Sequence, residues 1–269
     1  MSTVIVRNAG AGLSFQDCGR VGANSWLNYG VAPSGAIDSY SAHAANRLVH
    51  NLPTDTVLEM MLGGAEFEVT ADCWLAHTGG CHCLQLPTNT ARYVKQGEVL
   101  RFFPHPHGVW SYLAIAGGWV AKNYFGSSSR HERSAIGQSV STGCKLSAID
   151  TQSIAKPNNT SRYLPLKAQR NYPNAPKIRL YRGPHHDLFS KTDWQHLLEK
   201  SWTISSRSDR TGYRLIGSQR LQHQLSIHST PTLLGSVQIP PSGEPIVTLH
   251  DGPTVGGYPV IARVRPDDL

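Results

Sequence analysis

The sequence is poor in charged residues and has no long apolar run. Only 16% of its residues are charged and 39% are hydrophobic, a balance typical of a folded chain rather than a disordered one. No window approaches the ~18 consecutive apolar residues that a membrane-spanning helix needs. The first residues, MSTVIVRNAGAGLSF, lack the basic and apolar regions of a signal peptide. We therefore expect a cytoplasmic protein that has no membrane segment.

Cysteine is scarce, and its pattern does not favour a metal site. The chain has five cysteines, an odd number, and together with the missing signal peptide this indicates reduced thiols. The cluster HTGGCHC (77–83) resembles a metal-binding motif, but no second cysteine pair follows at ligand spacing. We interpret it as a strand with an incidental thiol pair. The histidines of PHPHG (104–108) and the pair His185-His186 fit exposed turns equally well. We expect no metal site.

Several motifs of nucleotide-binding and catalytic proteins are missing. There is no P-loop, no G-x-G-x-x-G between a strand and a helix, and no G-x-S-x-G elbow. The net charge is +7 and the pI is near 9.3, but the basic residues are scattered and do not alternate with aromatics. The sequence therefore predicts a solvated basic surface and no nucleic-acid partner.

The patterns that are present indicate a mostly β protein with a few short helices. Residues 34–51 show helical spacing, with Ser34 as a candidate N-cap, and residues 192–199 form a second short helix that begins at Thr192 or Asp193. Short strand-like runs separated by Gly/Pro turns are typical of barrels or sandwiches. These runs are TVLEMML, AEFEVT, CWLAHTG, GEVLRFF, SYLAIAG, KIRLYRG, GYRLIG, EPIVTLH and PVIARV.

A shift in composition divides the chain into two β halves. Residues 151–177 are rich in Asn, Ser, Pro and Lys and have no clear periodicity, so we interpret them as a linker or a surface crossing. The prediction is an N-terminal half over residues 1–150 and a C-terminal half over residues 178–269. The two halves show no clean internal repeat.

The segment FQDCGRVGANSWLNYGVAPSGAID (15–38) combines polar residues with four glycines before the first helix. Its candidate residues are Gln16, Asp17, Arg20 and Ser34. The start of a helix beside an arginine could bind an anion. An elaborate turn capped by Ser34 and Asp38 explains the same residues equally well.

The segment SSRSDRTGYRLIG (205–217) brings Arg207, Arg210 and Arg214 close together in the sequence. Guanidinium groups bind carboxylates or phosphates through two parallel hydrogen bonds. A surface hairpin with solvated arginines is the alternative interpretation.

The most unusual stretch is PIVTLHDGPTVGGYPVIARV (245–264). Two strand-like runs flank a ten-residue connector, which is longer than a hairpin turn requires. The run GSVQIPPSGEP (235–245) comes just before, and a hairpin between these neighbouring strand-like runs would bring Gln238 and Asp251 near each other. Asp251 could then act as a general base or orient an amide N–H. The pair Gly256-Gly257 allows the backbone to approach a ligand closely. The alternative is a β-bulge with a wide turn, in which Asp251 only binds backbone N–H groups.

Taken in order, these motifs resemble a known family over essentially the whole chain. The segments FQDCGRVG, YGVAPSGAID, LEMMLGGAEFEV, YLAIAGGW, LYRGPHHDLF, SDRTGYRLIG and QIPPSGEPIVTLHDGPTVGGYPVIARV are similar to the biotin-dependent carboxyltransferase family, subunit 2 type. Its members include allophanate hydrolase subunit 2, urea amidolyase-related proteins and the C-type subunit of 5-oxoprolinase.

The resemblance implies a fold of two cyclophilin-like β-barrel halves and a subunit 1 (B-type) partner. It implies one subunit of an ATP-dependent 5-oxoprolinase, which uses ATP with Mg in the complex and opens a lactam to glutamate together with a LamB/YcsF-type A subunit. One alternative is a carboxyltransferase that acts on urea or a related amide with carboxybiotin. The other is a binding protein that antagonises a kinase inhibitor. The sequence has no Met-Lys-Met biotinyl motif, so it does not predict a self-contained urea carboxylase.

The resemblance also selects site residues. Asp251 and Gln238 fall on family positions and are the predicted catalytic pair. The predicted substrate- or phosphate-binding residues are Arg182, Arg210, Arg214, Thr254, Gly256, Gly257 and Tyr258. The secondary candidates remain the four residues of the 15–38 segment.

The sequence departs from the family pattern in three places, of which the first is Cys18, where a hydrophobic residue is common. Ser128 stands where the family has arginine, and Gly252, Pro253 and Val255 differ within the connector. Family members also continue past Asp267-Asp268-Leu269, so we expect the C-terminal half to lack a final strand or to be a shortened form.

Overall fold

Strands dominate both units into which the chain divides. The computed structural model describes residues 3–106, 108–149, 161–170, 176–222 and 227–269. The first unit comprises Met1–Asn24 and Ser34–Ala175, and the second comprises Ser25–Pro33 and Pro176–Leu269. The main boundary therefore falls inside the predicted crossing segment. Ser25–Pro33 groups with the second unit, although it lies within the predicted N-terminal half. The prediction of a mostly β fold is confirmed, and closure into barrels stays a prediction.

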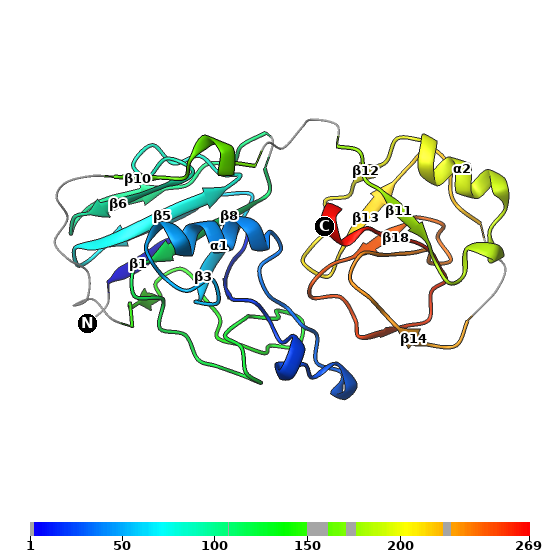
Figure 1. Cartoon of the computed structure of the whole chain (residues 1–269), viewed down its shortest axis with the longest axis horizontal. Helices are drawn as coiled ribbons and strands as arrows, with labels where there is room; N and C mark the ends of the chain where they lie inside the picture. The colour runs from blue at the N-terminus through cyan, green and yellow to red at the C-terminus, as the bar shows by residue number, and fades with distance from the viewer. Residues whose placement is uncertain (1–2, 107, 150–160, 171–175, 223–226) are drawn as a thin grey trace. The chain divides into compact units, whose positions relative to one another are not determined.

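The first unit contains a four-stranded and a six-stranded antiparallel sheet (Figure 1). The order of the smaller sheet is β7-β4-β1-β9, with β1 (Val4–Ala9), β4 (Ala65–Val69), β7 (Val99–Arg101) and β9 (Lys145–Leu146). The order of the larger sheet is β10-β6-β5-β8-β3-β2, with β2 (Leu13–Gln16), β3 (Val57–Met61), β5 (Cys73–Gly79), β6 (Thr90–Val94), β8 (Trp110–Ile115) and β10 (Arg162–Tyr163).

The larger sheet of the first unit is buried on both faces. Successive side chains of a strand point to opposite faces, and in β5 Leu75 joins the core that contains Phe67 of the smaller sheet. Trp74 and Ala76 belong to a second cluster, which contains residues of the first helix. This double burial explains why the strand CWLAHTG has no simple polar alternation.

The first helix, α1 (Ser39–Leu48), lies across the larger sheet (Figure 1). Its N-cap is Asp38, whose carboxylate accepts hydrogen bonds from the Ser41 backbone N–H at 3.0 Å and from the Ser41 hydroxyl at 2.6 Å. The predicted start at Ser34 is therefore wrong. Ser34 has a φ of +56° and stands in a left-handed turn that ends before the helix begins.

Part of the predicted crossing segment is attached to the first unit. β10 pairs with β6 at the edge of the larger sheet, and the 3-10 helix η3 (Leu166–Ala168) follows it. Residues 151–160 and 171–175 of that segment lie outside the described residues. The other 3-10 helices are η1 (Gly22–Asn24), η2 (Leu27–Tyr29), η4 (His186–Leu188) and η5 (Pro266–Asp268).

The second unit is built on one six-stranded antiparallel sheet in the order β11-β18-β15-β16-β13-β12. Its strands are β11 (Leu180–Arg182), β12 (Thr203–Ile204), β13 (Gly212–Ile216), β15 (Ser236–Gln238), β16 (Ile246–Thr248) and β18 (Val260–Val264), and β14 (Thr230–Pro231) pairs separately with β17 (Val255–Gly256). Its core joins sheet residues such as Val237 and Ile261 to Leu197 of the helix α2 (Lys191–Glu199).

Helix α2 begins with a capping box rather than at Thr192 or Asp193. The Ser190 hydroxyl accepts a hydrogen bond from the Asp193 backbone N–H at 3.0 Å, and the Asp193 carboxylate accepts one from the Ser190 backbone N–H at 3.1 Å. Asp193 is therefore the third helical residue and not the first. Across the described parts of the chain, no helix is both long enough and apolar enough to cross a membrane.

The interpretation of HTGGCHC as a strand is partly wrong. Strand β5 ends at Gly79, so Cys81 and Cys83 follow it in an irregular segment. Both thiols are nonetheless buried in the core of the first unit, and burial raises their pKa. All five cysteines, each within the described residues, are free.

Candidate functional site

The connector 250–259 is long because it does not close a hairpin. Strands β16 and β18 are not neighbours, since β15 lies between them and pairs with both. The chain must therefore cross the end of β15 before it can re-enter the sheet. The expected hairpin is wrong, and the ten residues are the length of this crossing.

The second half of the connector packs against Gln238. Strand β17 pairs with β14, and the Thr232 backbone N–H donates to the Thr254 carbonyl at 2.9 Å. A Cβ atom at Gly256 would lie 2.7 Å from Nε2 of Gln238, closer than side chains normally approach. Gly256 therefore leaves room for the Gln238 amide, which is 5% exposed. The structure thus joins Gln238 to the glycine pair and not to Asp251.

The first half of the connector holds a buried ion pair. The Arg210 guanidinium donates to Asp251 through Nε at 2.8 Å and through Nη2 at 3.1 Å. The side chains are 12% and 3% exposed, respectively. The Asp251 backbone N–H also donates to the Arg210 carbonyl at 3.0 Å, so both backbone and side chain join the two residues. Such bidentate, charge-assisted hydrogen bonds are among the strong interactions in proteins.

Gly252, one of the departures from the family pattern, has a packing reason. A Cβ atom there would lie 2.3 Å from Cγ2 of Thr248 and 2.9 Å from the Leu249 carbonyl oxygen. No rotamer of the connector can relieve the contact with the backbone oxygen. A side chain at this position would therefore displace the neighbouring backbone, which favours glycine after Asp251.

Sequence reasoning missed His250, which lies next to this ion pair. The residue is half-buried, and its Nδ1 atom is enclosed and has no hydrogen-bond partner among the described residues. Burial, together with the Arg210 charge, lowers the pKa of His250 to about 4, although Asp251 opposes this shift. The Thr248 hydroxyl, two residues earlier, is also enclosed without a partner among those residues. No motif pointed to His250, because its importance follows from its burial and from the charge of Arg210.

The other predicted arginines are dispersed. Arg182 on β11 is exposed, and its guanidinium lies 5.9 Å from the centre of the Trp194 ring. Arg214 on β13 is half-buried and pairs through its backbone with Ile246. Arg210 precedes β13, so Arg210 and Arg214 do not lie on the same strand.

The remaining predicted residues of the connector lie at its surface. Thr254 is half-buried, whereas Gly257 and Tyr258 are exposed. Tyr258 retains 44% of its accessible surface. These residues flank the position where Gln238 meets Gly256.

In the first unit, Asp17 is the centre of a dense hydrogen-bond network. The hydroxyls of Ser127 and Ser129 each donate to its carboxylate at 2.6 Å, and the backbone N–H groups of Gly19 and Ser128 donate at 2.7 and 2.8 Å. Burial alone would raise the pKa of Asp17, but these hydrogen bonds outweigh burial and lower it. Ser128, the departure from the family arginine, also donates its hydroxyl to this carboxylate at 3.1 Å.

The donors near the start of α1 are committed to protein acceptors. The backbone N–H groups of residues 35, 36, 37 and 38 donate to the Gln16 amide oxygen, the Asp17 carbonyl, Glu59 and the Tyr112 hydroxyl. Arg20 is fully buried and donates to the carbonyls of Tyr124 and Ser129. This arrangement favours the elaborate turn over an anion site.

Ser34 remains unusual within that turn. Its hydroxyl is buried without a partner among the described residues, and its backbone is left-handed. Across the part of the chain that the structure describes, no group of three or more His, Cys, Asp or Glu side chains is arranged to hold a metal ion. His107 of PHPHG lies outside the described residues.

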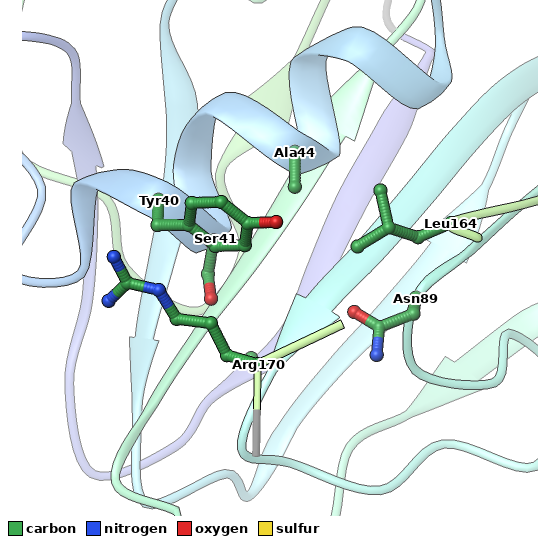
Figure 2. A pocket seen from close by; sticks show the side chains of 7 residues that line it. Tyr40, Ser41, Ala44, Asn89, Leu164 and Arg170 are labelled. Carbon is green, nitrogen blue, oxygen red and sulfur yellow. The ribbon is translucent and has the colours of Figure 1, made fainter. Parts of the chain in front are cut away.

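A small pocket in the first unit lies between α1 and the segment 161–170 (Figure 2). The Arg170 guanidinium stacks over the Tyr40 ring at 4.4 Å and lies 4.0 Å from Asp38, while the Tyr40 hydroxyl donates to the Ala168 carbonyl. These contacts fasten the segment to the helix. The lining residues, none of them a predicted site residue, are Tyr40, Ser41, Ala44, Gly79, Asn89, Leu164 and Arg170.

The chain is similar to curated enzyme subunits over almost its whole length. It is 33% identical to the 5-oxoprolinase C subunit of Escherichia coli, over 97% of this chain and 84% of that protein. It is 30% identical to the Haemophilus influenzae protein of the same name, over 95% of this chain and 82% of that protein. It is 28% identical to urea amidolyase of Saccharomyces cerevisiae, over 97% of this chain but only 15% of that protein.

Solved structures agree in fold. The crystal structure of TTHA0988 superposes with a TM-score of 0.83 at 31% identity, covering 100% of this chain. The Kluyveromyces lactis urea amidolyase superposes with a TM-score of 0.85 at 26% identity, covering 99% of this chain. This chain spans 52% of the TTHA0988 chain and 18% of the K. lactis chain.

A family model described as the carboxyltransferase domain, subdomain A and B, matches residues 29–269. The match includes the Arg210–Asp251 pair, the GGYP turn and most of both units. The chain belongs to this carboxyltransferase-domain family.

Proposed function

We propose that this chain is the C subunit of an ATP-dependent 5-oxoprolinase. The observation that carries the proposal is the similarity to two 5-oxoprolinase C subunits, which extends over 95–97% of this chain and more than four fifths of each relative. In this proposal the chain works in the cytoplasm, in a complex with B-type and LamB/YcsF-type (A-type) subunits. The complex opens the lactam ring of 5-oxoproline to glutamate.

The second unit supplies groups suited to a lactam that carries a carboxylate. The Gln238 amide can both donate and accept a hydrogen bond, which matches the N–H and C=O of a cyclic amide. Asp251 holds the Arg210 guanidinium in a fixed orientation, and a fixed cation stabilises negative charge that develops on a carbonyl or carboxylate oxygen. We assign Gln238 and Asp251 to the amide, and Arg182, Arg210 and Arg214 to anionic groups of the ligands.

We propose that ATP binds mainly to other subunits of the complex rather than to this chain. In the second unit, Arg210 is committed to Asp251, and Arg207 and Arg220 lie 3.7 and 4.0 Å from Glu244. These three guanidinium groups are therefore already paired with carboxylates and are not free to neutralise a triphosphate. ATP, bound with Mg, would supply the activation of the lactam, and we propose that partner subunits provide most of its contacts.

A second candidate function is carboxyl transfer to urea or a related amide from carboxybiotin. The family description and the similarity to urea amidolyase favour it. The same Gln238 and Arg210–Asp251 groups would then hold urea and a carboxylate. The substrate that stimulates turnover distinguishes the two functions.

The test is an assay of the complex purified with its partner subunits. We expect 5-oxoproline to stimulate ATP hydrolysis, and we expect Asp251→Asn and Arg210→Ala to lower this activity. The matched control is the exposed pair Arg179–Asp268, in which the guanidinium donates to the carboxylate at 2.6 and 3.0 Å. Arg179→Ala should keep the activity.

Full turnover in both site variants would show that these residues do not belong to the site. Stimulation by urea and carboxybiotin instead would favour the second function, and tight partner binding without any turnover would favour a binding protein.

A further inference from the structure

His250 has one enclosed end and one end nearer the solvent. Its Nδ1 atom is enclosed and has no hydrogen-bond partner among the described residues, whereas the residue as a whole is only half-buried. Of the two ring nitrogens only Nδ1 is enclosed without a partner, which leaves Nε2 as the nitrogen that a ligand can reach. Buried polar atoms in proteins normally have partners, so one without a partner calls for an explanation. The enclosed Thr248 hydroxyl two residues away adds a second such atom to the same short segment.

The surroundings of His250 keep its ring neutral. Burial and the Arg210 charge disfavour the imidazolium and lower the pKa of His250 to about 4, while Asp251 acts in the opposite direction. At pH 7 the ring then carries one proton. Unpaired N–H donors are rarer in protein interiors than unpaired acceptors. The proton is therefore expected on Nε2, where solvent or a ligand can accept it.

We propose that His250 is a substrate-contact residue whose neutral Nε2–H donates a hydrogen bond to a carbonyl or carboxylate oxygen of the substrate beside the Arg210–Asp251 pair. This inference rests on the proposed function and adds to it a residue that the sequence motifs do not include. The ligand class is a small carboxylic acid that contains an amide. A neutral donor suits this position, because it polarises an oxygen without placing a second positive charge beside Arg210.

His77 provides an internal comparison. Unlike His250 it is fully buried, but it too has one nitrogen without a partner among the described residues and a pKa lowered to about 4. Its ring, however, lies in the apolar core, 4.9 Å from the Phe102 ring centre. Its Nδ1 lies 3.0 Å from the Leu86 carbonyl oxygen, so this nitrogen carries the proton. The two histidines thus share a neutral charge state but differ in burial, in tautomer and in access to ligand.

The first experiment is NMR of the full chain labelled with ¹⁵N-histidine. At pH 7 we expect neutral rings for both residues, with the proton on Nε2 in His250 and on Nδ1 in His77. Saturating 5-oxoproline should shift the His250 ring signals and leave those of His77 in place. His250→Gln assigns the signals. If none of the three compounds 5-oxoproline, glutamate and urea shifts the His250 ring signals, the proposal is wrong.

The second experiment is kinetics of the assembled complex. Losing one hydrogen bond to substrate should raise KM for 5-oxoproline about 2- to 10-fold in His250→Leu. His250→Gln, which keeps a donor, should recover part of this loss. His77→Leu should leave KM unchanged. An unchanged KM in His250→Leu, in a complex whose wild type turns over 5-oxoproline, would contradict the proposal.

The two experiments separate the two claims. If the wild-type complex shows no 5-oxoproline-dependent ATP hydrolysis, the proposed function fails. The NMR titration with urea and glutamate then still decides whether His250 contacts an amide or carboxylate ligand. If His250→Leu does not fold, the wild-type titration and His250→Gln decide in its place.

Discussion

Removing the Arg210 side chain should destabilise the second unit strongly. In Arg210→Ala, the Asp251 carboxylate, 3% exposed, would remain buried without its cation. Leaving one member of a buried ion pair uncompensated costs about 3–5 kcal/mol, whereas typical surface changes cost far less. For a unit of this size, each kcal/mol corresponds to roughly 4–8 °C in Tm. We therefore expect Tm to fall by at least about 12 °C.

The assay should resolve the second unit from the first. Urea unfolding gives the total loss, and hydrogen exchange read by mass spectrometry locates it, with the strongest effect at the Asp251 amide, which donates to the Arg210 carbonyl. Arg179→Ala, at the exposed pair with Asp268, is the control and should have a much smaller effect. The double variant Arg210→Met/Asp251→Leu should recover most of the loss, because it removes both charges. A loss below about 1 kcal/mol in Arg210→Ala would refute the reasoning.

Three further predictions concern pH, packing and the first unit. The folded pKa of His77 is lowered to about 4 from 6.5, so the stability it contributes is present above pH 6.5 and is lost as pH falls towards 4. The loss should approach about 3 kcal/mol, and His77→Leu should flatten urea midpoints measured between pH 7 and 4. Gly252→Ala should cost about 1–3 kcal/mol because its methyl would meet the Thr248 side chain and a backbone carbonyl, whereas Gly257→Ala, with only contacts at 3.7 Å, should be tolerated in the same thermal scan. Asp17→Asn should cost about 2–3 kcal/mol by weakening hydrogen bonds to a charged acceptor, and this difference from wild type should begin to shrink below about pH 4, the ordinary pKa of the carboxyl, and should disappear only as pH falls through the lowered pKa of the folded protein.

The sequence predicted the strands well because their signals are local. Runs such as CWLAHTG and PVIARV are apolar, β-branched or aromatic, and are bounded by turn residues, so they correspond to β5 and β18. The predicted starts of the helices were less accurate. Ser34 satisfies the composition of an N-cap, but its left-handed backbone places the cap at Asp38 instead.

The arrangement of the site depended on long-range pairing that no local pattern contains. The connector 250–259 was expected to close a hairpin, but β15 inserts between the two strands, so Asp251 meets Arg210 and Gln238 meets Gly256. The family motif identified these residues, while their grouping follows from the strand order. His250 could not have been chosen from the sequence, because it is defined by an enclosed nitrogen and by the neighbouring Arg210 charge.

The most direct measurement of the central claim is 5-oxoproline-dependent ATP hydrolysis by the chain assembled with its B-type and A-type partners. We expect ATP turnover to rise when 5-oxoproline is added and glutamate to accumulate in proportion. Arg210→Ala should reduce both, whereas Arg179→Ala should not. A stable complex in which 5-oxoproline changes neither ATP turnover nor glutamate formation would contradict the central claim.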